Sequence, residues 1–98
     1  MELDGKVALV LGSIKGIGRA IGLSLAESGV RLALTYHDWE EKLPEMRSAF
    51  EQTGADVMIE KIDLLETDRI QALIDHVRDR FGRLDILVNN IERGGWPV

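Results

Sequence analysis

The glycine-rich stretch at residues 12–18, GSIKGIG, constrains the fold of this chain more than any other feature. It follows a continuously apolar run at residues 7–11, which is typical of a strand buried on both faces of a parallel sheet. Directly after it, Ile17, Ile21 and Leu25 recur at helical spacing, and we expect this side of the helix to pack against the sheet. The stretch is therefore a turn between a buried strand and an amphipathic helix.

The start of that helix is predicted to attract an anion. Its first N–H groups have no partner within the helix, the helix dipole is positive at this end, and glycine lets a phosphate group approach. The spacing G-x-x-x-G-x-G differs from the common pattern G-x-G-x-x-G, and no Gly-Lys-Ser/Thr follows as in loops that bind ATP or GTP. We interpret residues 12–18 as a cradle for the pyrophosphate of a dinucleotide. The alternative is a turn that only lets the strand meet the helix.

Composition narrows the class of partner. Twelve basic and 17 acidic residues give the 98-residue chain a formal net charge of −5, which argues against a nucleic-acid partner. The absence of cysteine excludes disulfides and thiolate metal sites and suits a cytoplasmic location. No secretory signal is expected at the start, and no apolar stretch approaches the ~20 residues that cross a bilayer.

Strand and helix patterns alternate along the chain. We expect strands at about 6–11, from Leu32 toward Tyr36, at 56–62 and at 84–88. We expect helices at about 16–28, from Pro44 to Gly54, and from an N-cap at Thr67 to Gly82. This alternation predicts an α/β fold, a doubly wound parallel sheet with strand order 3-2-1-4. The first two helices should cover one face and the third helix the other. One face then carries a single helix and the fourth strand has a free edge, so we expect residues 1–98 to be the N-terminal part of one larger domain, or a homo-oligomer.

Two segments resemble landmarks of the short-chain dehydrogenase/reductase family. Residues 10–18, VLGSIKGIG, are similar to its T-G-x-x-x-G-[IL]-G signature, and residues 85–90, DILVNN, resemble its D-x-L-V-N-N-A-G segment. The resemblance covers essentially the whole chain but only the first part of a family member. It implies a Rossmann-like fold, a dinucleotide cofactor and, in the full-length protein, interconversion of a carbonyl and an alcohol on a small-molecule substrate.

The resemblance also implies cofactor-binding residues in the turn and at three strand ends. They are Gly12, Ser13, Lys15, Gly16, Ile17 and Gly18 in the turn, and Tyr36, His37, Asp63, Leu64, Asn89 and Asn90 at the strand ends. Three of them have a simpler alternative: Ser13 as an ordinary turn residue, Lys15 as a solvated charge, and Asp63 as a strand-end cap. The chain departs from the family pattern at two places. Leu11 replaces a threonine whose hydroxyl normally ties the turn together, and Ile91-Glu92 replaces the Ala-Gly that follows the two asparagines.

Cofactor choice is predicted from the end of the second strand. Tyr36 holds the position where NAD-preferring relatives place an acid that binds the ribose 2′-hydroxyl. Lys15 and His37 fall where NADP-preferring relatives often have basic side chains. The resemblance therefore favours NADP over NAD.

No catalytic residue can be assigned within the chain. The family uses Y-x-x-x-K, whereas Tyr36 is the only tyrosine here and Glu40 stands four residues further on. His37 and His76 are too far apart in sequence to suggest a metal pair. Two alternatives to the cofactor-binding part of an oxidoreductase remain: a non-catalytic dinucleotide-binding or sensor module, and a structural half-sheet that oligomerises.

Overall fold

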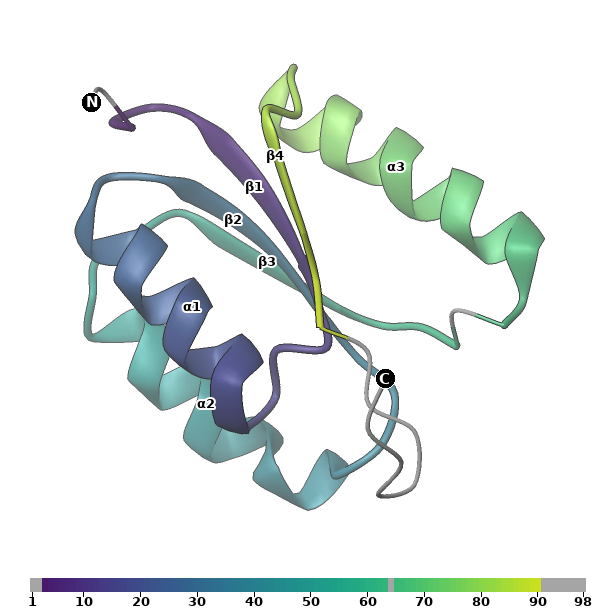
Figure 1. Cartoon of the computed structure of the whole chain (residues 1–98), viewed down its shortest axis with the longest axis horizontal. Helices are drawn as coiled ribbons and strands as arrows, with labels where there is room; N and C mark the ends of the chain where they lie inside the picture. Colours follow the sequence, from purple (N-terminus) through teal and green to yellow (C-terminus); the bar gives the residue numbers. More distant parts are fainter. Residues whose placement is uncertain (1–2, 64, 91–98) are drawn as a thin grey trace.

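The computed structural model describes residues 3–63 and 65–90, and in this part strands and helices alternate as a parallel α/β fold (Figure 1). The elements are β1 (Val7–Leu11), α1 (Gly16–Glu27), β2 (Arg31–Tyr36), η1 (Glu40–Lys42), α2 (Leu43–Glu51), β3 (Val57–Lys61), α3 (Thr67–Phe81) and β4 (Ile86–Asn89). All strand pairs are parallel, and the order across the sheet is β3-β2-β1-β4. The predicted fold class and strand order are confirmed.

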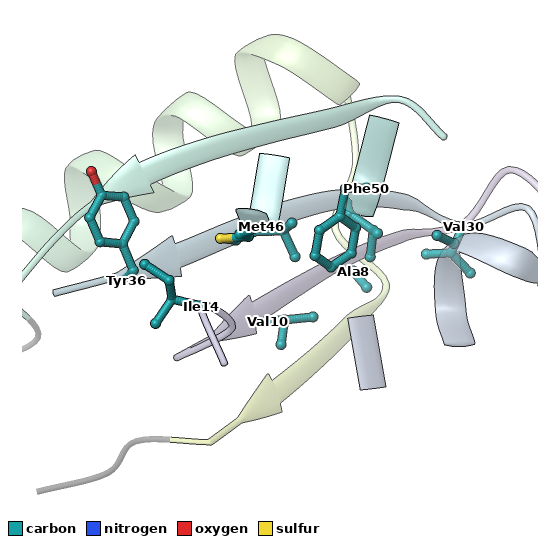
Figure 2. Packing of buried hydrophobic residues seen from close by; sticks show 10 residues of the cluster. Ala8, Val10, Ile14, Val30, Tyr36, Met46 and Phe50 are labelled. Atoms are coloured by element: carbon teal, nitrogen blue, oxygen red, sulfur yellow. The ribbon is translucent and has the colours of Figure 1, made fainter. Parts of the chain in front are cut away.

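The sheet separates two apolar clusters, one on each face. Helices α1 and α2 lie together on one face and α3 lies on the other (Figure 1). Alternate residues of β1 point to opposite faces, so Ala8 and Val10 join the α1–α2 side, where Met46 and Phe50 of α2 are also buried (Figure 2). Val7 and Leu9 join the α3 side. Burial of β1 on both faces explains its continuously apolar sequence.

Helix α1 packs through a different side from the one predicted. Its buried residues are Gly18, Gly22 and Ala26, whereas Ile17 is 68% exposed. The spacing of four residues was right, but the contact face is shifted by one residue because small residues let the helix approach closely. A Cβ on Gly22 would lie 2.9 Å from Cζ of the buried Phe50 ring. The apolar pattern alone does not reveal so close an approach.

Helix α3 buries Leu73, Val77 and Phe81, which recur at helical spacing along one side. It ends at Gly82, whose φ of 79° is the left-handed conformation that glycine adopts without strain. The predicted N-cap is wrong by one position: Thr67 is the first helical residue, and Glu66 is the N-cap without a side-chain capping bond. No helix within the described residues is long and apolar enough to cross a membrane.

Strand β4 forms the outer edge of the sheet in the described residues. It pairs with β1 through Ala8↔Ile86 to Leu11↔Asn89. Leu87 on this strand is 63% exposed, whereas Ile86 and Val88 pack against the cluster on the α1–α2 side. The exposed Leu87 side chain therefore lies on the face of the sheet that carries the single helix α3.

Candidate functional site

The turn between β1 and α1 presents main-chain N–H groups at the carboxyl edge of the sheet. Gly12 and Gly16 have φ values of 78° and 60°, which glycine adopts most easily. A Cβ on Gly16 would meet nothing within 4 Å, so the main chain there is open to approach. Helix α1 has no side-chain cap and no acidic residue in its first turn. The amide of Arg19 donates to the carbonyl of Lys15 at 3.4 Å, so by helix geometry residues 16–18 lack an intrahelical acceptor.

Thr35 of β2 anchors the first half of this turn. Its hydroxyl accepts a hydrogen bond from the Gly12 amide at 3.2 Å. Its carbonyl accepts from the Ser13 amide at 2.9 Å and from the Ser13 hydroxyl at 3.1 Å. Thr35 thus supplies the turn with the hydroxyl that Leu11 lacks. Sequence reasoning missed Thr35, although a threonine within an otherwise apolar strand was a visible signal.

Arg19 anchors the second half of the turn and was also missed. Its Nε and Nη2 donate to the carbonyl of Ile14 at 3.0 and 2.5 Å. Its Nη1 donates to Glu45 on α2, and this hydrogen bond lowers the pKa of the Glu45 carboxyl from its usual value. The Ile14 side chain is buried in the core beneath (Figure 2). The guanidinium therefore holds the Ile14 carbonyl and links the turn to α2.

Asn90 joins the end of β4 to the same turn. Its amide side chain donates to the carbonyl of Gly12 at 3.0 Å, and its main-chain N–H donates to Leu11 at 2.9 Å. Gly18 faces this contact, since a Cβ there would lie 1.9 Å from the Gly12 oxygen. Of the predicted site residues, the structure thus brings Gly12, Gly18 and Asn90 together. The neighbouring Asn89 is exposed at the end of β4.

The ends of β2 and β3 place three further predicted residues at the same edge. Tyr36 is 9% exposed, and its ring belongs to the core cluster with its hydroxyl at the end of the strand (Figure 2). Nε2 of His37 lies 3.9 Å from Oδ2 of Asp63. Oδ1 of Asp63 accepts from the Leu65 amide at 3.0 Å, so Asp63 also caps its strand end. Leu64 and Ile91-Glu92 lie outside the described residues.

Lys15 and Ser13 differ in what they offer a ligand. Ser13 is fully buried, so its hydroxyl belongs to the turn. The Lys15 ammonium lies over the ring of Trp39, 3.6 Å from the centroid. An open glycine, amides free of a cap and a fixed ammonium together fit the phosphates of a dinucleotide. Residues 3–63 and 65–90 contain no group of three side chains able to hold a metal ion.

The sheet order and the glycine-rich first turn define an α/β protein of the doubly wound class. The family model for the short chain dehydrogenase family matches residues 6–93, and the chain belongs to this family. The resemblance found in the two sequence landmarks is thereby confirmed.

Individual relatives agree with this assignment. A 3-oxoacyl-(acyl-carrier-protein) reductase FabG from Staphylococcus aureus is 39% identical over 85 residues, covering 87% of this chain and 35% of the relative. A variant of a Serratia marcescens short-chain dehydrogenase/reductase has a TM-score of 0.87 at 36% identity, covering 96% of this chain and 38% of that one. L-Sorbose reductase from Gluconobacter frateurii, complexed with NADPH and L-sorbose, has a TM-score of 0.83 at 35% identity. The match covers 100% of this chain and 38% of the reductase. The chain spans little more than a third of the length of these proteins.

Proposed function

We propose that this chain is the cofactor-binding part of an NADP(H)-dependent oxidoreductase that interconverts a carbonyl and an alcohol on a small molecule. The observation that carries the proposal is the start of α1, where an uncapped helix begins at a glycine with open space beside it. Such a terminus stabilises a negatively charged group through its N–H groups and its dipole. Family membership and a relative crystallised with NADPH support the same conclusion.

Each predicted residue has a part in this proposal. The amides of Gly16, Ile17 and Gly18 hold the pyrophosphate, with Gly12 and Ser13 shaping the turn. Asp63 and Leu64 contact the adenine, and Asn89 and Asn90 border the nicotinamide ribose. When bound, the nicotinamide supplies or accepts the hydride. The chain's own residues bind and orient it, and we expect no turnover from these 98 residues, since no catalytic residue is assigned.

The preference for NADP(H) rests on the residues around the end of β2. Lys15 and His37 supply basic groups, and Tyr36 stands where an acid would repel a 2′-phosphate. We expect Tyr36→Asp to shift the preference from NADPH toward NADH. An unchanged ratio of the two dissociation constants would contradict this account of β2.

The test of the cradle is a fluorescence titration of the chain with NADPH. We expect Gly16→Ala to weaken binding by at least about tenfold, because the new Cβ would occupy the open space beside the helix start and keep the phosphate from one charge-assisted hydrogen bond, which contributes about 1.5–3 kcal/mol. Gly54→Ala is the matched control: both glycines have positive φ values, 60° and 74°, and open space around a new Cβ, but Gly54 lies between α2 and β3. Equal binding by both variants, or no binding by the wild-type chain at millimolar NADPH, would overturn the proposal.

The same proposal includes how the chain is organised. We propose that residues 1–98 form the N-terminal part of a single domain of a cytoplasmic protein. The exposed Leu87 on the edge strand β4 supports a cover there, by further strands or by a second copy of the chain. Light scattering tests the second option, because a monomer over the whole concentration range would exclude self-association.

A further inference from the structure

Trp39 has no role in the proposed cofactor site, yet it contacts one of that site's residues. Its indole ring lies under the Lys15 ammonium, 3.6 Å from the centroid. Lys15 immediately precedes α1, and Trp39 lies three residues beyond the end of β2. The pair therefore bridges the glycine-rich turn and the loop after β2, which in a doubly wound fold flank the adenosine ribose.

Trp39 has an unusual backbone conformation, at the N-cap position of η1. Trp39 is the only non-glycine residue of the described segments with a positive φ, at 62°. A bulky side chain disfavours this conformation, and such outliers gather at ligand sites. Burial of the side chain does not offset the strain of this backbone conformation, because 48% of Trp39 is exposed. The contact that the ring gains is the Lys15 ammonium.

The Lys15 charge is held in place without being neutralised. Within residues 3–63 and 65–90 its ammonium forms no ion pair, and carboxylates near the strand ends contact other groups. Glu40 contacts Lys61 at 2.6 Å, and Asp63 lies 3.9 Å from His37. An aromatic face attracts a cation through its quadrupole and brings no negative charge. A carboxylate in the same place would cancel the charge and repel a phosphate.

We propose that Trp39 is a positioning residue for cofactor specificity: its ring holds the Lys15 ammonium where it meets the 2′-phosphate of NADP(H). This inference rests on the proposed function and adds a residue to it. In this proposal Lys15 meets the 2′-phosphate and the amides of residues 16–18 hold the pyrophosphate, so the contribution of Trp39, which acts through Lys15, is confined to the 2′-phosphate. The nicotinamide half and the pyrophosphate are bound without it.

Calorimetry of the chain with 2′,5′-ADP and with 5′-AMP tests the inference, because these ligands differ only in the 2′-phosphate. We expect Trp39→Gly to weaken 2′,5′-ADP binding by about two- to fivefold, the worth of an exposed cation–π contact, and to leave 5′-AMP binding unchanged. Glycine removes the ring and accepts the left-handed backbone. Trp39→Phe keeps an aromatic face and should retain most of the preference.

A double-mutant cycle separates this role from a structural one. In a Lys15→Met background, Trp39→Gly should no longer change 2′,5′-ADP binding, because the ring then has no ammonium to hold. An unchanged ligand ratio in Trp39→Gly, or the same loss in the Lys15→Met background, would overturn the inference alone. Equal weakening of both ligands would mean that the ring stacks on adenine instead. A wild-type chain that binds neither ligand would overturn the proposed function as well.

Discussion

Replacing Gly18 by alanine tests the closest approach in the site. The new Cβ would lie 1.9 Å from the Gly12 oxygen and 2.7 Å from the Asn90 amide nitrogen. The nearer atom is main chain, so we take the upper end of overpacking costs, about 3 kcal/mol. Loss of the Asn90 hydrogen bond to Gly12 adds about 1 kcal/mol. The higher helix propensity of alanine adds back about 1 kcal/mol of unfolding free energy. The expected net loss in unfolding free energy is about 3 kcal/mol.

Urea unfolding followed by circular dichroism measures this loss, and Gly22→Ala is its matched control. Gly22 lies one turn further along α1 and gains the same helix propensity. Its new Cβ would meet the far end of the Phe50 ring at 2.9 Å, and a side-chain tip can shift where a main-chain carbonyl cannot. We expect Gly22→Ala to lose about 1 kcal/mol or less. Equal stability of the two variants would refute the argument from the main-chain clash.

Two further predictions concern single side chains. Thr35→Val keeps the shape but removes the acceptor of the Gly12 amide, so urea unfolding should show a loss of about 1–2 kcal/mol, whereas Thr35→Ser should lose less. A valine variant as stable as the serine variant would contradict this role. For Asp85, hydrogen bonds from Arg83 and from the Val7 amide lower the pKa of the carboxyl. The ionised carboxylate therefore stabilises the fold at pH values above the ordinary pKa of about 3.9. This stability is lost as the pH falls through the lowered pKa of the folded state. Thermal unfolding should therefore show wild type above Asp85→Asn at neutral pH, with the gap closing in acid. A gap that does not depend on pH would contradict the charge as its cause.

The order of the strands could be predicted because it depends on patterns that are local in sequence. The apolar strands and the glycines at 54 and 82 were visible without knowing any partner. Alternation with right-handed crossovers then leaves few arrangements, and the observed one is β3-β2-β1-β4. The contact face of α1 was missed because Gly18 and Gly22 carry no apolar signal. Their importance comes from what lies opposite them, the Gly12 carbonyl and the Phe50 ring.

The contacts that shape the turn could not be predicted, because each depends on strand register or on the placement of a second element. Thr35 reaches the turn because Val10 pairs with Leu34, which brings the next residues of β1 and β2 side by side. Arg19 lies in a helix and bonds a carbonyl five residues earlier, a contact that requires the bend at Gly16. The proposed anion site therefore depends on two sets of residues. The glycines that open it can be recognised from the sequence, and the side chains that hold it open can be recognised only once the sheet has assembled.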